Sequence, residues 1–281
     1  MIQIQDEERK ALSRYIHASS AIALDESKGY LIEGRLGALV EEMGCRSYGE
    51  LLARAQSEAT GVTRRRIIDA ITTGETLFFR DSSPFELLRN KILPELIDRR
   101  SRSGGNRPIR IWSAACSSGQ EAYSIGIVLK ELLGDPYRYG VRLLGTDISD
   151  HAVARASRGV YNRVEIERGL SGAALSKYFV QVAEGWRIRD EIRGLASFRT
   201  LNLAQDFTSL GRFDLILCRN VAIYFNEQDK TSLFHRIGNT LESDGYLIIG
   251  AMESLGNTCP EFESSRHMRS VYYTLKGGGV R

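Results

Sequence analysis

Cysteine is scarce in this sequence of 281 residues, and the few cysteines lie far apart. Cys45, Cys116, Cys218 and Cys259 form no CxxC pair, and no histidine cluster lies near them. Disulfide frameworks and zinc sites require cysteines that are paired or grouped with histidines, so the sequence predicts neither. We expect reduced thiols in a cytoplasmic protein, and no bound metal.

Long hydrophobic runs are also missing. No apolar run approaches the roughly 20 residues that span a bilayer. Residues 1–12 contain acids and lack the apolar core of a signal peptide. Lys and Arg number 38 against 35 Asp and Glu, a net charge of +3. This balance neither requires nor excludes a nucleic acid or an acidic protein as partner, and no membrane insertion is expected.

Short helical patterns fill residues 1–82, which predicts a small all-helical domain. Residues 83–108 are predicted to form a linker that begins with a helix, because Pro84 suits the first turn and apolar residues up to Leu96 keep helical spacing. The helix runs into a glycine pair at 104–105 among many arginines, typical of a loop. This basic run is either a solvated linker or a contact for an acidic partner.

The pattern changes after residue 108. Short, continuous apolar runs now alternate with helical patterns, and the runs occupy residues 109–114, 141–145, 213–218 and 245–250. Such alternation predicts an α/β domain over residues 109–281, with a doubly wound, mostly parallel sheet. A last apolar run at 270–275 has no helix after it, which predicts an antiparallel edge strand, as in class I methyltransferases.

Ligands of doubly wound sheets lie beyond the carboxyl ends of the strands. The first strand end, at residues 113–121, is rich in small residues and leads into a helix, so the backbone can approach a ligand. Only Gly119 is a glycine there, which gives weak support for the pyrophosphate grip of a dinucleotide site. The loop suits a ligand without phosphates, such as S-adenosylmethionine.

Polar residues end the next strands. Asp147 can accept hydrogen bonds from two ribose hydroxyls, or it can cap the following helix. Asn202 can contact an adenine edge or form a turn. The strand that ends at Cys218 lacks the Asn/Asp-Pro-Pro-aromatic sequence of many enzymes that methylate amide or exocyclic nitrogens. Methylation of nucleobase or glutamine nitrogens is therefore disfavoured.

Five segments together resemble the chemotaxis receptor methyltransferases, the CheR family. They are TTGETLFFRD, AACSSGQEAYS, GTDIS, the Asn202-Leu203 pair and FDLILCRNVAIYF. The resemblance extends over nearly the whole chain, and it implies a helical domain followed by a Rossmann-like methyltransferase domain. It also implies methyl transfer from S-adenosylmethionine to receptor glutamates. The products would be glutamate methyl esters, used in chemotactic adaptation, and S-adenosylhomocysteine.

The resemblance also assigns roles to single residues. The implied cofactor contacts are Thr76, Arg80, Glu121, Asp147, Asn202, Leu203, Arg219 and Asn220. Among them, Arg80 lies near the methionine carboxylate and Glu121 takes the ammonium. Tyr224 lies near the transferred methyl in the family, although it could equally be a buried aromatic. Gly74 stands where the family usually has Asn, so it can contact a ligand only through its backbone.

Residues 72–81 contain the adjacent pair Phe78-Phe79, which cannot share one buried face in either a strand or a helix. In the family this segment lies between the domains. We therefore expect Phe78 and Phe79 to pack against different partners.

The expected nucleophile is a glutamate carboxylate, with a pKa of about 4.3, which is ionised at neutral pH and needs no general base. Catalysis would then rest on positioning and desolvation. By analogy with a junction arginine of the family, Arg100 and Arg102, with Arg99, are candidates to orient that carboxylate. Residues 64–66 are three arginines that either steer an acidic receptor helix or form an exposed helix edge.

A small antiparallel β-subdomain is expected at about residues 178–198, again by resemblance. In some members a loop there grips a pentapeptide at the receptor C-terminus. The loop after Phe179 is several residues shorter here, so we expect independence from that tether.

Two other functions stay open. One is a methyltransferase acting on a small molecule or RNA, although no basic and aromatic stripe is evident. The other is a cofactor-binding adaptor without activity. The sequence favours a monomer and identifies neither the receptor array nor the methylated glutamates.

Overall fold

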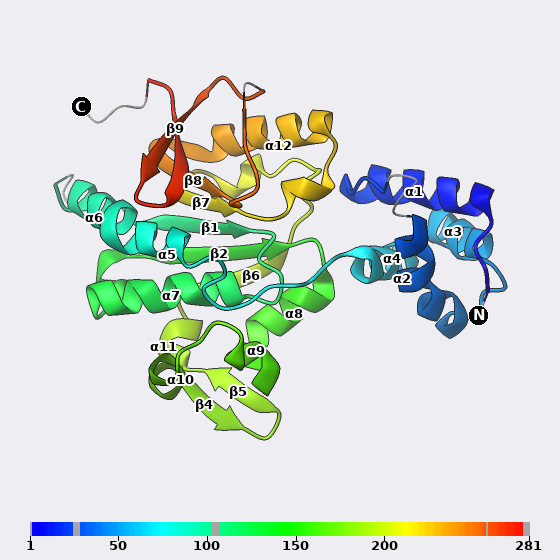
Figure 1. Ribbon diagram of the computed structural model, residues 1–281, viewed down its shortest axis with the longest axis horizontal. Helices are drawn as coiled ribbons and strands as arrows, with labels where there is room; N and C mark the ends of the chain where they lie inside the picture. Colours follow the sequence, from blue (N-terminus) through cyan, green and yellow to red (C-terminus); the bar gives the residue numbers. More distant parts are fainter. Residues whose placement is uncertain (1, 25–28, 103–106, 257, 278–281) are drawn as a thin grey trace.

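The computed structural model describes residues 2–24, 29–102, 107–256 and 258–277. In this part of the chain a helical domain lies at one end of the molecule and a sheet flanked by helices fills the other (Figure 1). The helical domain contains α1 (Asp6–Ser20), α2 (Gly29–Glu42), α3 (Tyr48–Ser57) and α4 (Val62–Ile71). Buried Leu12, Ile16, Leu36 and Tyr48 belong to its core. The expected all-helical domain is therefore present.

The predicted helix after Ser83 is also present. It begins as α5 (Ser83–Leu87) with Pro84 in its first turn, passes through a π-helical turn, η2 (Leu88–Ile92), and ends as α6 (Leu93–Arg102). The sequence pattern gives no sign of the π-helical turn. Residues 103–106 of the expected linker lie outside the described residues.

The main sheet has the strand order β6-β2-β1-β7-β8-β10-β9. Its strands are β1 (Arg110–Ala114), β2 (Arg142–Asp147), β6 (Ala196–Thr200), β7 (Phe213–Cys218), β8 (Leu241–Ile249), β9 (Phe262–His267) and β10 (Ser270–Leu275). The strands from β6 to β8 are parallel, and β10 is antiparallel to β8. The predicted antiparallel terminal strand is confirmed, but β9 lies outside it and forms the edge.

Helices cover both faces of this sheet. Leu215 and Leu217 of β7 pack in one core cluster with residues of α6 and α7 (Gln120–Leu133). Ile216, between them in sequence, packs on the opposite face with residues of α12 (Glu227–Thr240). All six residues of β7 are buried, because alternating side chains enter two different cores.

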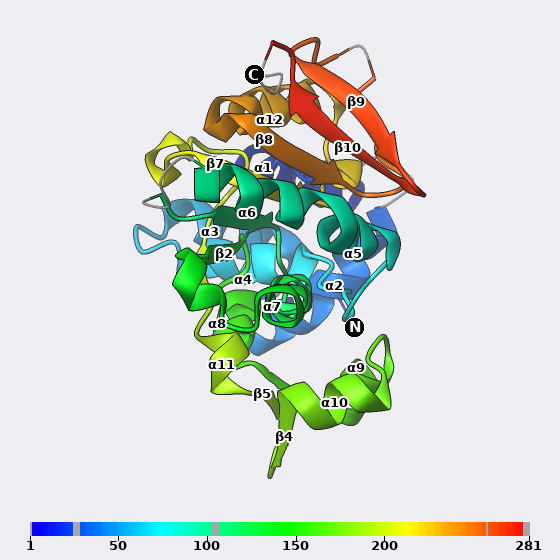
Figure 2. The same ribbon diagram turned by 90° about the vertical axis from the view of Figure 1, so that its left-hand side faces the viewer.

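The small antiparallel sheet has the order β3-β5-β4 and projects from the main body (Figure 2). It contains β3 (Val160–Tyr161), β4 (Phe179–Val182) and β5 (Gly185–Ile188), with α9 (Arg163–Glu167) and α10 (Gly172–Tyr178) beside them. The sequence-based bounds of 178–198 need correction, because β3 comes from upstream and residues 196–200 form β6 of the main sheet.

Candidate functional site

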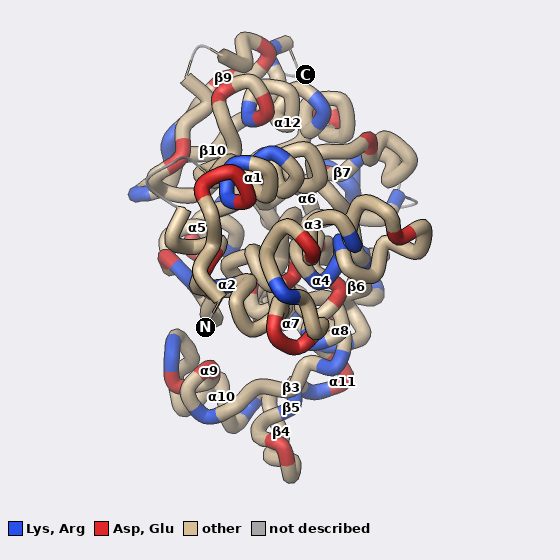
Figure 3. The backbone as a smooth tube through the Cα atoms, turned by 90° about the vertical axis from the view of Figure 1, so that its right-hand side faces the viewer, with Lys and Arg blue, Asp and Glu red and all other residues tan. Residues whose placement is uncertain are grey.

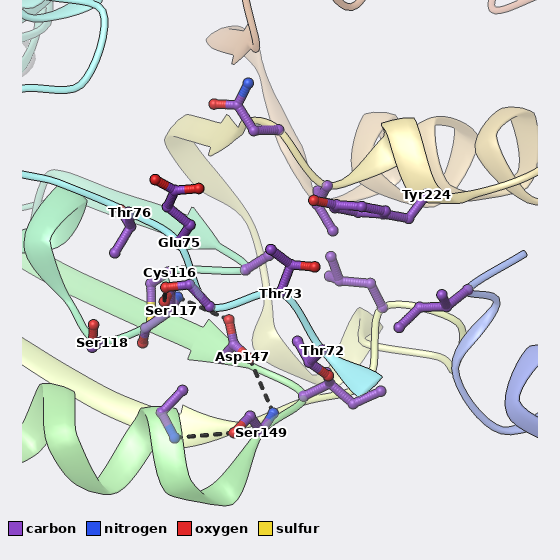
Figure 4. A pocket seen from close by; sticks show the side chains of 18 of the residues that line it. Thr72, Thr73, Glu75, Thr76, Cys116, Ser117, Ser118, Asp147, Ser149 and Tyr224 are labelled. Atoms are coloured by element: carbon purple, nitrogen blue, oxygen red, sulfur yellow. Dashed lines mark hydrogen bonds between the residues drawn. The ribbon is translucent and has the colours of Figure 1, made fainter. Parts of the chain in front are cut away.

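A cavity of about 380 Å³ opens at the carboxyl ends of β1, β2 and β7, where the helical domain meets the sheet. Its volume is within the usual range for small-molecule sites. Nine of the residues singled out in the sequence line it: Thr76, Arg80, Glu121, Asp147, Asn202, Leu203, Arg219, Asn220 and Tyr224. In Figure 4, Tyr224 projects into this cavity from the side opposite Thr76 and Ser118.

The loop after β1 bends sharply beneath the cavity. Ala115 and Ser117 have φ values of 57° and 50°, and Gly119 has 95°, so three of its residues adopt left-handed conformations. A Cβ at Gly119 would lie 2.9 Å from the Cβ of Ala156 in α8 (Asp150–Arg158), so only glycine fits there. The small residues of this loop therefore allow a tight turn directly into α7.

Asp147 stabilises this loop from the end of β2. Its Oδ2 accepts from the backbone N–H of Ser117 at 2.8 Å, and its Oδ1 accepts from that of Ser149 at 3.0 Å (Figure 4). Ser149, whose hydroxyl accepts from the N–H of Ala152, is the cap of α8, so the alternative role of Asp147 as that cap is excluded. Burial raises the pKa of Asp147, although the backbone hydrogen bonds partly oppose this.

A buried ion pair crosses the floor of the site. Arg219 donates to Oε2 of Glu121 at 2.8 Å and to Oδ2 of Asp81 at 3.0 Å. It also donates to the backbone carbonyl of Arg80 at 2.9 Å, and its side chain is only 2% exposed. The other oxygen of Glu121 accepts from the hydroxyl of Ser113 at 2.7 Å. Arg219 thus joins the strand end, the first turn of α7 and the interdomain segment.

The interdomain segment 72–81 crosses over the cavity. The hydroxyl of Ser117 donates to the carbonyl of Gly74 at 2.9 Å, so Gly74 takes part through its backbone, as expected. Arg35 of α2 donates to the carbonyl of Ile71 and, at 2.9 Å, to the hydroxyl of Thr73. These bonds connect the segment to both domains.

The two phenylalanines of this segment face different partners, as predicted. Phe78 is fully buried in the small subdomain, with ring centroids 4.9 Å from Tyr161 and 5.4 Å from Phe179. The ring of Phe79 contacts that of Phe85, at 5.2 Å, and Phe79 lies between the cluster of Phe78 and the core beneath the main sheet. A φ of 51° at Phe79 makes this divergence possible, and its N–H donates to the hydroxyl of Ser124. The segment therefore joins three parts of the molecule.

The connection after α1 forms a wall of the cavity that no sequence pattern predicted. Ile22, Ala23 and Leu24 line it beside Leu203. The Asn202 amide donates to the carbonyl of Ser19 at 2.8 Å, and the N–H of Ala23 donates to the carbonyl of Tyr224 at 2.8 Å. The helical domain is thus part of the site. Its contribution has no local signature, because apolar residues after a helix resemble any other packing residues.

Arg100 and Arg102 require a correction, because neither lines the cavity. Arg100 forms an ion pair with the fully buried carboxylate of Asp214, near the amino end of β7, whereas the cavity lies beyond the carboxyl end. Burial lowers the pKa of Arg100. Arg102 is exposed at the last position of α6, which lies far from the helical domain (Figure 1). Arg100 therefore compensates a buried carboxylate of the fold, and neither arginine is at the domain junction.

The cavity fits S-adenosylmethionine in its chemistry. Asp147 accepts hydrogen bonds from two backbone N–H groups, and no basic side chain is among its hydrogen-bond donors. Its carboxylate therefore suits neutral donors such as the hydroxyls of a ribose. Apolar Ile22, Ile148 and Leu203 can cover an adenine ring, and Arg80 is a cation available to a carboxylate. Among the described residues, no group of His, Cys, Asp and Glu side chains is arranged to hold a metal ion. No helix there is long and apolar enough to cross a membrane.

Comparison with known proteins gives matches to both domains. Residues 7–72 match the family described as "CheR methyltransferase, all-alpha domain" and residues 74–271 match "CheR methyltransferase, SAM binding domain". The chain is 39% identical to "Chemotaxis protein methyltransferase Cher2" of Pseudomonas putida over 267 residues, 93% of this chain and 95% of that protein. It is 40% identical to "Chemotaxis protein methyltransferase 1" of Pseudomonas aeruginosa, with the same coverage. A "Chemotaxis protein methyltransferase" of Vibrio parahaemolyticus is 36% identical over 280 residues, 98% of this chain and 99% of that protein.

Proposed function

Because this chain belongs to the CheR family of S-adenosylmethionine-dependent chemotaxis methyltransferases, we propose that it methylates glutamate side chains on the cytoplasmic helices of chemoreceptors. The product is a glutamate methyl ester that serves chemotactic adaptation. The observation that carries this proposal is an arginine from the helical domain, Arg35, on the wall of the cofactor cavity.

Arg35 has the properties needed to orient a substrate carboxylate. Its side-chain hydrogen bonds to the carbonyl of Ile71 and the hydroxyl of Thr73 are to neutral groups, so its positive charge is not compensated by them. Arg80, on the facing segment, likewise donates to a neutral carbonyl, that of Glu75. Two guanidinium groups can therefore serve two carboxylates, one of the cofactor and one of the substrate. Arg35 would therefore have the role that the family resemblance predicted for Arg100 and Arg102.

The chemistry requires little from the protein beyond placement. S-adenosylmethionine supplies an electrophilic methyl group when bound. A glutamate side chain is ionised at neutral pH and can attack without a general base. Arg35 would orient this carboxylate, and Tyr224 would fix the place beside the methyl group at which the carboxylate approaches. Arg80, Glu121, Asp147, Asn202, Leu203, Arg219 and Asn220 would hold the cofactor, together with Thr76.

Electrostatic steering by residues 64–66 receives little support from the structure. Arg65 lies 3.6 Å from the carboxylate of Asp150, and Arg66 pairs with Glu42. Basic and acidic positions are intermixed on the helical domain (Figure 3). We therefore place the recognition of an acidic receptor helix at the cavity mouth and treat residues 64–66 as an exposed helix edge.

Independence from a receptor pentapeptide is part of the proposal. Val182 pairs with Gly185, so only residues 183–184 connect β4 to β5. Such a short connection lacks the length to wrap a peptide. Calorimetry with a receptor C-terminal pentapeptide should give no binding; measurable affinity would refute this part. We further propose a cytoplasmic monomer.

A transfer assay tests the function directly. Purified protein is mixed with methyl-labelled S-adenosylmethionine and receptor cytoplasmic fragments, and volatile label released by mild alkali indicates a carboxyl methyl ester. Arg35→Ala should raise the KM for the fragment and leave the affinity for S-adenosylhomocysteine unchanged. Arg46→Ala, an exposed arginine of the same domain, is the control. Alkali-stable label would indicate another substrate, such as RNA or a small molecule. Cofactor binding without any transfer would favour an adaptor.

A further inference from the structure

The carboxyl ends of β7 and β8 are joined by one carboxylate oxygen. Oε2 of Glu253 accepts from the backbone N–H of Asn220 at 2.8 Å and from that of Gly250 at 2.7 Å. The N–H of Glu253 donates to the carbonyl of Gly250 at 2.9 Å, which closes a turn and directs the side chain toward β7. Because both backbone donors lie at strand ends, Glu253 fixes the spacing of two loops next to the cavity.

Asn220 needs such support because of its backbone conformation. Its φ of 57° is in the left-handed region, which non-glycine residues adopt only when their surroundings hold them there.

Gly250 shows how closely the Glu253 carboxylate and the Asn220 backbone approach each other. A Cβ at that position would lie 2.5 Å from Oε2 of Glu253 and 3.0 Å from the nitrogen of Asn220. Only glycine leaves room for the carboxylate between the two strands.

The turn at Asn220 connects two parts of the reaction site. Arg219, immediately before it, is the buried cation that binds Glu121 and Asp81. Four residues after it, Tyr224 ends the short helix η5 (Ala222–Tyr224) and lines the cavity. A change in the backbone at Asn220 would move both side chains, in addition to Asn220 itself.

We propose that Glu253 is a positioning residue for methyl transfer. It does not line the cavity, and it acts through the backbone of Asn220, which it holds in the conformation that places Arg219 and Tyr224. The property of Glu253 that matters for this role is that one side-chain oxygen accepts hydrogen bonds from two backbone N–H groups. The effect on turnover rests on the proposed function, whereas the effect on cofactor affinity does not.

Two substitutions separate the acceptor from the charge. Glu253→Ala removes the acceptor, and Glu253→Gln retains an amide oxygen that can accept both bonds without charge. We expect Glu253→Ala to lower kcat about tenfold or more, and to weaken binding of S-adenosylhomocysteine by about tenfold, at temperatures well below Tm. Glu253→Gln should retain both properties to within about threefold. Glu263→Ala, an exposed glutamate on β9, is the matched control and should behave as the unchanged protein.

Each result decides the proposal. Wild-type kcat and affinity in Glu253→Ala would overturn it, as would equal damage in the Ala and Gln variants. A lower Tm without kinetic change would show a merely structural role. If Glu253→Ala does not fold, Gly250→Ala is the second test, because its methyl would displace Oε2 and should reproduce the expected losses. If the unchanged protein transfers no label to receptor fragments, the proposed function fails, and the affinity measurements still test Glu253.

Discussion

Replacing Asp147 with Asn tests the proposed cofactor site most directly. The substitution preserves the size of the side chain, and it replaces one oxygen with an NH2 group. Both oxygens now accept backbone hydrogen bonds, from Ser117 and Ser149. In the variant, the new NH2 group would face one of these N–H donors, so a hydrogen bond would become a repulsion between two donors.

The expected loss follows from the hydrogen-bonding capacity of the carboxylate. It has roughly four lone-pair positions, of which two are occupied, so about two remain for ribose hydroxyls. Hydrogen bonds to charged groups contribute about 1.5–3 kcal/mol each. Asn keeps one acceptor oxygen, so the loss lies between that of one such bond, about 1.5–3 kcal/mol, and that of two, about 3–6 kcal/mol, which together correspond to a rise in Kd of about 10- to 20,000-fold. We therefore expect Asp147→Asn to weaken binding of S-adenosylhomocysteine by at least about tenfold.

The affinity should also depend on pH. Burial raises the pKa of Asp147 from its ordinary value of 3.8. The ionised form is the better acceptor, so affinity is fully present above the raised pKa and declines as the pH falls through it. The effect on the unliganded protein has the opposite sign. A raised carboxyl pKa contributes stability below the unfolded-state pKa, which is lost as the pH rises through the folded-state pKa.

Isothermal calorimetry at several pH values provides the measurement, with circular dichroism to confirm folding. Asp150→Asn is the control, because Asp150 is exposed, close in sequence and not part of the cavity wall. An unchanged Kd in folded Asp147→Asn would refute the ribose assignment. Equal losses in both variants would also contradict it, since they would indicate a general effect of removing negative charge.

Three further substitutions test the corrected site and the packing around it. Arg100→Ala should lower the free energy of unfolding by about 3–5 kcal/mol in urea titrations, because the Asp214 carboxylate would stay buried without its cation. Weakened cofactor binding in the folded variant would contradict a purely structural role for Arg100. Phe78→Ala should lower the free energy of unfolding by about 3–5 kcal/mol in the same titration, because a fully buried ring is removed. Phe79→Ala should lower it less, because Phe79 is partly exposed, and a larger loss for Phe79→Ala would contradict this assignment. Tyr224→Phe should leave S-adenosylhomocysteine affinity unchanged and reduce methyl transfer in the labelled assay, whereas unchanged turnover would exclude a direct role for its hydroxyl.

The apolar runs predicted most of the main sheet because its central strands are buried on both faces. Residues 213–218 coincide with β7, and residues 270–275 coincide with β10. β9 lacked such a signal, because only Phe262 among its residues is buried and the rest of the strand is polar. The third strand of the small sheet, Val160–Tyr161, is too short for any periodicity to show.

The site was predictable to the extent that it lies at strand ends. Carboxyl ends of parallel strands meet at one edge of a sheet, so Asp147 and Asn202 were expected together from topology, whereas Arg219 was assigned to the site only by the family resemblance. Arg100 could not be placed in this way. A helical pattern shows which face of a helix is apolar, but the direction in which the helix crosses the sheet depends on packing against other elements.

Local sequence is enough to specify the alternation of helices and strands, the small-residue loop after β1 and the incompatibility of Phe78-Phe79 with one buried face. These features depend on local sterics and on side-chain periodicity, which short segments contain in full. Three other features depend on how the whole chain packs: α1 and α2 line the cavity, Arg100 lies at the opposite end of the sheet, and Glu253 joins two strand ends. Those relations depend on contacts between residues far apart in the chain, such as Asn202 with Ser19 and Asn220 with Glu253.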